Sequence, residues 1–224
     1  TDPGALAEGP IDLDALAAEP GLDVFATAAP TDIDNADLVV LPGSRSTLAD
    51  LDWLRRLGLA DALVARAAAG RPILGICGGY QMLTEVIDDP VESAQGAEAG
   101  LGLLPARVRF GAEKVLGRPS GSWHGHPVVG YEIHHGVVAP TGGEPFLDGV
   151  RAGNTWGTIW HGAFENDAFR RAWLTELAET VGSAWRPAEG APGFAERRTR
   201  MLDDLADALT AHVDLNTLRE LATR

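Results

Sequence analysis

The sequence predicts an α/β fold in which an open, mostly parallel sheet is flanked by helices, with a helical extension at the C-terminus. Two apolar runs, residues 38–41 and 72–76, have the length and composition of strands that are buried on both faces. Apolar residues at helical spacing follow each run. This alternation of strand and helix favours parallel strands joined by right-handed crossovers.

The composition is that of one globular domain. The chain has 224 residues, of which 45% are hydrophobic and 22% charged, which excludes a disordered chain and a coiled coil. We expect a single domain over 1–224, with 1–35 weakly defined, a core over 36–181 and a helical tail over 194–224. No apolar run is long enough to span a membrane, and the N-terminus has no apolar signal core.

Charge and cysteine content limit the classes of partner. The chain has 18 Lys+Arg against 32 Asp+Glu, a net charge of −14, which disfavours nucleic acid and anionic membranes as partners. The lone cysteine, Cys77, forms no internal disulfide and anchors no cysteine-based zinc site. We therefore expect a cytoplasmic protein with no metal centre.

The first ninety residues predict most of the elements that position a site. Thr47 is a candidate N-cap for the helix that follows the first apolar run. Pro42 and Gly43 stop that run, and Gly70 ends a later helix. The predicted elements are helix 12–19, strand 22–27, strand 38–41, a helix from residue 48, helix 60–69, strand 72–76 and helix 80–87.

The remaining chain predicts further strands and two amphipathic helices. The segment 88–125 is rich in Gly, Pro and Ser, and we expect an exposed loop at 112–125. The tail helix carries four apolar residues at core spacing, namely Met201, Leu202, Leu205 and Leu209. The predicted elements are strands 106–110, 127–134 and 155–161, helix 166–181, a loop at 182–193 and a helix from 194 to about 221.

Cys77 lies at the predicted turn between strand 72–76 and the following helix. Glycines flank it, and small neighbours allow the sharp turn on which a nucleophile is presented. The N-terminus of the helix favours a thiolate, and the N–H of Gly78 is placed to stabilise an oxyanion. The alternative is an unreactive core cysteine.

A cysteine nucleophile needs a base, and His161 is the first candidate. It ends the predicted strand 155–161, and open α/β sheets collect their active sites at strand carboxyl ends. His134, at the end of strand 127–134, is the second candidate. A zinc site is a further alternative with no standard spacing; it would use His124, His126, His134 and His135.

Four motifs carry a family resemblance, and they occur in the family's order. Segment 75–83 reads Gly-Ile-Cys-Gly-Gly-Tyr-Gln-Met-Leu, and segment 41–47 reads Leu-Pro-Gly-Ser-Arg-Ser-Thr. Segment 130–136 reads Gly-Tyr-Glu-Ile-His-His-Gly, and segment 157–167 reads Gly-Thr-Ile-Trp-His-Gly-Ala-Phe-Glu-Asn-Asp. Over residues 36–175 the chain resembles class I (triad-type) glutamine amidotransferases, which have a flavodoxin-like fold. The resemblance is to the cobyric acid and cobyrinate branch, and within it to the C-terminal glutaminase domains of cobyric acid synthases.

The resemblance implies a role for each matching residue. Cys77 attacks the side-chain amide of glutamine to form a thioester, and His161 is the base. The backbone N–H groups of Gly43 and Gly78 match the oxyanion hole. The positions that match the glutamine-binding residues are Gln81, Tyr131 and His134. Without the resemblance, Gln81 reads as a solvated residue in the first turn of a helix.

Two departures from the family pattern matter. Most triad enzymes have a glutamate two residues after the histidine, where this chain has Ala163, so the sequence supports a Cys–His dyad. A third group is left open, with Glu165 or a partner domain as candidates. The chain also has no P-loop motif and a single lysine, Lys114. We therefore expect ATP and Mg²⁺ only in a synthetase domain that is absent from this chain, which is then a fragment, a separate subunit or a degenerate copy.

The resemblance implies glutamine hydrolysis that supplies ammonia to that synthetase domain. The acceptor is a corrinoid, cobyrinic acid a,c-diamide, whose side-chain carboxylates are amidated with ATP in cobalamin biosynthesis. Two alternatives remain open: the glutaminase subunit of a peptidoglycan-precursor amidating ligase, and a catalytically silent interaction domain.

Overall fold

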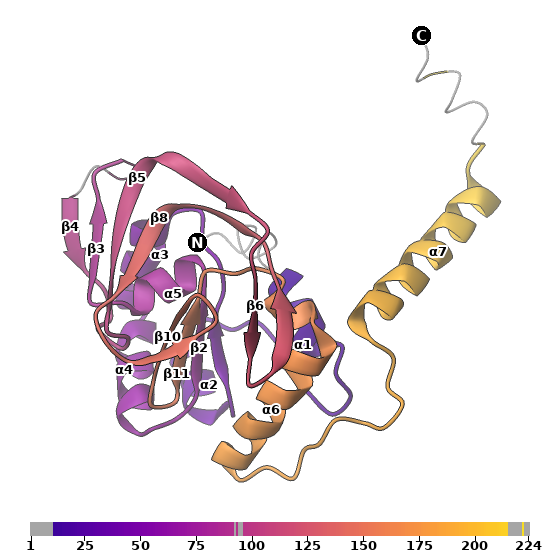
Figure 1. Cartoon of the computed structure of the whole chain (residues 1–224), viewed down its shortest axis with the longest axis horizontal. Coiled ribbons are helices and arrows are strands. Elements are labelled where there is room, and N and C mark those ends of the chain that lie inside the picture. The colour runs from indigo at the N-terminus through magenta and orange to yellow at the C-terminus, as the bar shows by residue number, and fades with distance from the viewer. Residues whose placement is uncertain (1–10, 92, 94–95, 215–220, 222–224) are drawn as a thin grey trace. The chain divides into compact units, whose positions relative to one another are not determined.

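The computed structural model describes residues 11–91, 93, 96–214 and 221. It divides into two compact units, residues 1–187 and 188–224. The first unit contains mixed sheets flanked by helices, which confirms the α/β class (Figure 1). Among its described residues, the second unit forms a long helix.

The central sheet has five strands, and its parallel part is the part that the sequence predicts. The order is β1 (Val39–Leu41), β2 (Ile73–Ile76), β11 (Thr155–Thr158), β10 (Gly149–Ala152) and β9 (Glu144–Phe146). β2 runs parallel to both β1 and β11, whereas β10 and β9 add an antiparallel edge. β2 lies between two parallel neighbours and all four of its residues are buried, so its uninterrupted apolar run is the pattern that the position requires.

Helices cover both faces of this sheet. Two consecutive residues of β11 show this, because their side-chain positions face opposite sides of the sheet. A side chain at Gly157 would lie 2.1 Å from the Tyr80 ring, so α5 (Gly78–Leu83) packs closely on this face. Trp156, the preceding residue, points to the other face. There its ring contacts Trp173 of α6 (Asp167–Val181), with the ring centroids 5.5 Å apart.

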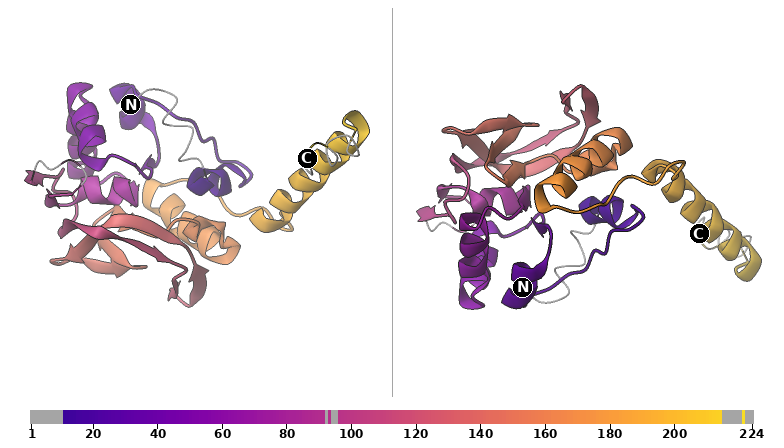
Figure 2. Two further views of the ribbon diagram at one scale, coloured as in Figure 1. Left: turned by 90° about the horizontal axis from the view of Figure 1, so that it is seen from above. Right: turned by 90° about the horizontal axis from the view of Figure 1, so that it is seen from below.

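The remaining helices of the first unit are α1 (Ile11–Ala17), α2 (Pro30–Asn35), α3 (Thr47–Arg56), α4 (Leu59–Ala68) and the short 3-10 helix η2 (Ala163–Glu165). Leu51 of α3 and Leu63 of α4 are fully buried in the main core. Figure 2 shows α3 and α4, in violet, on one side of this unit and the strands of a second sheet, in rose, on the other.

The second sheet has the order β4 (Gly96–Ala99), β3 (Val86–Asp89), β5 (Ala106–Gly117) and β8 (Glu132–Pro140), and β6 (Ser120–Trp123) pairs with β7 (His126–Val129) as a hairpin. The exposed loop predicted at 112–125 is therefore wrong. These residues form the end of β5 and the hairpin, because β5 continues past an irregularity between Phe110 and Val115 to pair with β8.

Other boundaries also differ from the prediction. The strand predicted at 155–161 ends at Thr158, so His161 lies beyond it, in an isolated bridge with Tyr131. The helix predicted over 80–87 ends at Leu83, where Thr84 becomes extended and its hydroxyl donates to the Gln81 carbonyl at 2.8 Å. The strand predicted over 127–134 is divided between β7 and β8, so His134 lies within a strand and not at its end. The strand predicted at 22–27 is absent, since these described residues form no sheet pairing. Thr47 is the first residue of α3, and Ser46 takes the N-cap position.

The second unit contains α7 (Phe194–His212). The four apolar residues predicted to form a core along it are exposed, with exposed fractions from 48% for Leu209 to 59% for Met201. Helical spacing is thus present, but it does not by itself bury a face. The end of the helix predicted beyond 214 falls largely outside the described residues. Within the part of the chain that the structure describes, no helix is long and apolar enough to cross a bilayer.

Candidate active site

Cys77 lies on a strained turn between β2 and α5. Its backbone has φ 51° and ψ −112°, and residues other than glycine rarely adopt a positive φ. Its N–H donates to the Thr158 carbonyl at 2.8 Å, which ties the turn to the end of β11. Strained backbone of this kind persists where the surroundings enforce it, and such sites are often functional.

The glycines around Cys77 are required by close backbone contacts. A Cβ at Gly79 would lie 2.0 Å from the Leu41 carbonyl oxygen, and a Cβ at Gly75 would lie 2.7 Å from the backbone of Tyr80. These distances exclude any side chain unless the backbone moves. The Gly-x-Cys-Gly-Gly pattern is therefore what allows the turn to close against β1 and α5.

The loop after β1 lies directly against the turn. A Cβ at Gly78 would lie 2.6 Å from the Ser44 nitrogen, and a Cβ at Gly43 would lie 2.9 Å from Cε1 of His161 and 3.8 Å from Cβ of Cys77. The structure thus brings together four residues singled out in the sequence: Gly43, Cys77, Gly78 and His161. Ser44 anchors the loop because its hydroxyl donates to Asp50 at 2.6 Å.

His161 is held on three sides. Its Nδ1 lies 2.7 Å from Oδ2 of Asp12, whose Oδ1 accepts a hydrogen bond of 2.7 Å from the N–H of Gly162. The Tyr131 ring stacks on the imidazole with a centroid distance of 5.2 Å, and two backbone hydrogen bonds of 2.9 Å join the same two residues. With Nδ1 directed to Asp12, the other ring nitrogen is left for Cys77.

The charge environment favours a protonated imidazole. Burial alone lowers the pKa of His161, but hydrogen bonds to Asp12 and to the Cys77 sulfur, together with the negative charges of both, raise the pKa to about 10. An imidazolium beside the sulfur stabilises a thiolate, the nucleophilic form of cysteine. The pKa of Tyr131 is also raised, by burial and by the negative charges around it, so its phenol stays neutral.

Gln81 and His134 lie at the contact between α5 and β8. Gln81 is 2% exposed, so its interpretation as a solvated residue is wrong. Its Oε1 accepts from the Thr47 hydroxyl at 2.9 Å, and its Nε2 donates to the Gly136 carbonyl at 3.2 Å. Nδ1 of His134 lies 2.8 Å from the same carbonyl. Of the two candidate bases, His161 is the one that lies beside Cys77, since a Cβ at Gly43 would lie 3.7 Å from its Nε2 and 3.8 Å from Cβ of Cys77.

Asp12 is the site residue that sequence reasoning missed. The third group was left to Glu165 or a partner domain, whereas the structure places the Asp12 carboxylate at Nδ1 of His161. Asp12 reads in the sequence only as an acid near the start of a predicted helix, where acids are common. The two residues are 149 positions apart, so no local pattern connects them.

The remaining histidines do not form a metal site. The His124 ring stacks on Trp123, and Nδ1 of His135 lies 3.3 Å from the Gly111 carbonyl. Among the described residues, no group of three or more His, Cys, Asp or Glu side chains could hold a metal ion. The four-histidine zinc alternative therefore finds no matching cluster.

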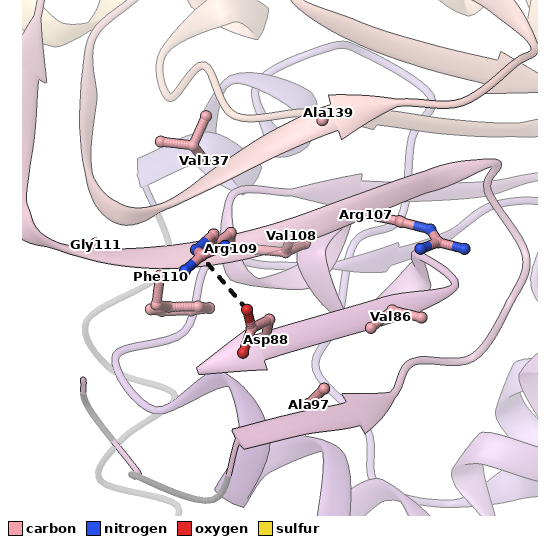
Figure 3. A pocket seen from close by; sticks show the side chains of 10 residues that line it. All are labelled: Val86, Asp88, Ala97, Arg107, Val108, Arg109, Phe110, Gly111, Val137 and Ala139. Atoms are coloured by element: carbon pink, nitrogen blue, oxygen red, sulfur yellow. Dashed lines mark ion pairs between the residues drawn. The ribbon is translucent and has the colours of Figure 1, made fainter. Parts of the chain in front are cut away.

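A hollow of about 660 Å³ opens on the outer face of the second sheet, away from Cys77 and His161. Two charged residues of its lining form an ion pair: Nε of Arg109 in β5 lies 3.8 Å from Oδ2 of Asp88 in β3 (Figure 3). Arg107 lies on the same strand face, 3.9 Å from Glu85. Neither the nucleophile nor the base lines this hollow, so it is separate from the candidate active site.

Comparison with known proteins agrees with this geometry. Residues 7–169 match the model of the CobB/CobQ-like glutamine amidotransferase domain. The cobyric acid synthase of Streptomyces avermitilis is 56% identical over 210 residues, which cover 94% of this chain and 42% of that protein. The cobyric acid synthase of Cutibacterium acnes is 52% identical over 214 residues, covering 94% and 44%. The chain therefore spans less than half the length of these curated relatives.

The fold also has a counterpart among solved structures. The crystal structure of a glutamine amidotransferase superposes with a TM-score of 0.58 at 20% sequence identity, covering 75% of this chain and 91% of that one. This likeness concerns the fold alone, and it confirms the predicted α/β class, although the described sheets are mixed and not mostly parallel. On the match of residues 7–169 and the identity to these relatives, the chain belongs to the CobB/CobQ-like glutamine amidotransferase family.

Proposed function

We propose that this chain is the glutaminase part of a cobyric acid synthase, releasing ammonia from glutamine through Cys77 and His161. The observation that carries the proposal is the placement of His161 beside Cys77, both against Gly43, where Cys77 occupies a strained strand–helix turn and Asp12 lies at Nδ1 of the imidazole. A buried structural cysteine needs neither the strained backbone nor the charged partner.

The first half of the proposed reaction forms a thioester. The Cys77 thiolate attacks the side-chain amide carbon of glutamine, and the backbone N–H groups of Gly43 and Gly78 stabilise the oxyanion that develops. The imidazolium of His161 then gives its proton to the amide nitrogen. The carbon–nitrogen bond breaks, ammonia leaves, and a glutamyl thioester on Cys77 and a neutral imidazole remain.

The second half releases glutamate. Neutral His161 takes a proton from a water molecule, which attacks the thioester carbon. The carbon–sulfur bond breaks, and the thiolate and the imidazolium are both restored. Asp12 accepts the Nδ1–H hydrogen bond throughout, so that it keeps the other ring nitrogen directed at the sulfur and stabilises the imidazolium.

The role predicted for Gln81, a contact with the substrate glutamine, has to be revised. Its amide already bonds to Thr47 and Gly136, so in this structure it joins α3, α5 and β8. We propose that Gln81 and His134 shape the end of the site that holds the amino-acid part of glutamine. Tyr131 packs against the imidazole of His161.

The ammonia would serve a synthetase part that this chain does not contain. The similar cobyric acid synthases are more than twice as long as the aligned segment, and the chain has no P-loop motif for ATP. We propose that ATP, Mg²⁺ and the corrinoid substrate, cobyrinic acid a,c-diamide, bind in that part. The single unpaired cysteine suits a reducing cytoplasm.

The test is glutamate release from glutamine by the purified chain, alone and with the synthetase part of a cobyric acid synthase added, against Cys77→Ser as the control. We expect turnover that requires Cys77 and rises when the synthetase part is added. No turnover in either condition by a folded chain would favour the silent interaction domain instead.

A further inference from the structure

A buried arginine joins the two chain segments that carry Asp12 and His161. Arg170 of α6 is 1% exposed. Its Nε and one terminal nitrogen donate to Oε1 of Glu19 at 2.9 and 2.6 Å. Its other terminal nitrogen donates to the Phe164 carbonyl at 2.7 Å. The guanidinium therefore bonds to two segments outside its own helix at once.

Each of those two segments leads to the catalytic pair. Glu19 lies two residues after the end of α1, the helix that carries Asp12. Phe164 lies in η2, three residues after His161. The arginine thus fastens α1 and η2 together at one end, and the hydrogen bond between Asp12 and His161 joins the same two segments at the other.

The buried ion pair of Glu19 and Arg170 is unfavourable in desolvation free energy, which is hard to explain if the pair only stabilises the fold. Glu19 is 2% exposed, its Oε1 also accepts from Nε of Arg171 at 2.9 Å, and its Oε2 has no hydrogen-bond partner. Burying a charged pair costs desolvation free energy that the attraction often only offsets, and apolar replacements are frequently as stable. Beyond any effect on stability, a planar, forked guanidinium fixes the geometry between its hydrogen-bond partners.

We propose that Glu19 and Arg170 are positioning residues for the glutaminase reaction, which hold α1 against η2 so that Asp12 reaches Nδ1 of His161. The inference rests on the proposed function of the Cys77 site. A helix of seven residues has little stability of its own. Ala15 and Leu16 bury its apolar side, but apolar contacts are non-directional and leave the carboxylate free to shift by the small distance that breaks a hydrogen bond.

The experiment measures alkylation of Cys77 by iodoacetamide as a function of pH, together with glutamate release, in Glu19→Ala. We expect alkylation at neutral pH to slow about tenfold, because less of the thiol is held as the reactive thiolate. Glu19→Gln keeps an oxygen that accepts the arginine hydrogen bonds, so it should restore most of the rate. In the Asp12→Ala background, Glu19→Ala should slow alkylation no further, because it acts through Asp12.

Two further variants separate positioning from stability. Leu174→Ala removes a buried side chain from the same helix without touching the ion pair, so it should lower the melting temperature and leave the alkylation profile unchanged. Arg170→Lys keeps the charge but cannot bond Glu19 and the Phe164 carbonyl in one fork. It should slow alkylation as Glu19→Ala does, and it gives an independent result should Glu19→Ala fail to fold.

Wild-type alkylation and turnover in Glu19→Ala or in Arg170→Lys would overturn the proposal. An equal further loss in the Asp12→Ala background would also overturn it, since Glu19 would then act by another route. Failure of the proposed function would give a different result. Glutamine turnover would then persist in Cys77→Ala, both with and without a substitution of Glu19.

Discussion

The carboxylate of Asp12 lies 2.7 Å from Nδ1 of His161, and the same carboxylate accepts the N–H of Gly162. Both oxygens are therefore directed at the strand-end segment that carries the imidazole. This relationship makes the site a three-residue arrangement of carboxylate, imidazole and thiol, although the glutamate that most triad enzymes carry two residues after the histidine is Ala163 here.

Replacing Asp12 by Asn should make the stability of the protein less dependent on pH. The pKa of His161 is about 10 in the folded chain against 6.5 for the ordinary side chain, so the folded state binds the proton more tightly. This stabilisation is complete below about pH 6.5 and is lost as the pH rises toward 10. We expect urea unfolding to show Asp12→Asn destabilised by at least about 1 kcal/mol near pH 6, with the difference narrowing by pH 10.

Asp14→Asn is the matched control, because Asp14 lies on the same helix and is exposed. It should change stability little at any pH. A deficit in Asp12→Asn that stays constant from pH 6 to pH 10 would contradict the assigned hydrogen bond to His161.

Cys77→Ala should abolish glutamine-dependent amidation in a complete enzyme and leave ammonia-dependent amidation intact. The thiol is needed only to release ammonia, and the step that uses ATP is proposed to lie in another part of the protein. Amide formation with glutamine or with ammonium chloride as the nitrogen source measures the two activities separately. Loss of both in a folded variant would mean that Cys77 takes part in the second reaction or supports the structure.

His161→Ala should slow the alkylation of Cys77 at neutral pH by about tenfold or more, because the imidazolium that stabilises the thiolate is lost. Some reactivity should remain, since the sulfur still lies at the start of α5. The rate of iodoacetamide modification across the pH range is the measurement.

His134→Ala is the matched histidine control. Its Nδ1 bonds to the Gly136 carbonyl, so we expect near wild-type alkylation in that variant. The opposite pattern, with His134→Ala slowed and His161→Ala unaffected, would transfer the role of base to His134.

Gly79→Ala should destabilise the fold by at least about 2 kcal/mol, because its Cβ would lie 2.0 Å from a backbone carbonyl oxygen. In an ordinary helix this substitution stabilises by up to about 1 kcal/mol, so the sign of the effect is diagnostic. Gly111→Ala, where no atom lies within 4 Å of the added Cβ, should change the unfolding free energy by less than about 0.5 kcal/mol. Equal melting temperatures for the two variants would refute the tight packing of the turn.

The sequence alone was sufficient for the local features of the site. The apolar run ending at Ile76 predicts β2, because a strand between two parallel neighbours is apolar on both faces. The glycines beside Cys77 predict the sharp turn, and the family motifs select His161 as its partner. The helix predicted at 166–181 is found as α6, with Asn166 as its N-cap. In each case, the prediction depends only on residues that are close together in the sequence.

Tertiary structure alone decided the features that depend on residues far apart in the chain. The β5–β8 pairing turned an expected loop into strand, because exposed side chains such as Leu116 and Ile133 carry no burial pattern and only the partner strand satisfies the backbone. Met201 and Leu205 show the reverse, since helical spacing predicts a buried face only where another element covers it. Asp12 is the clearest case. An acidic residue at the start of a helix can have many roles, and only folding brings its carboxylate within 2.7 Å of an imidazole 149 residues away.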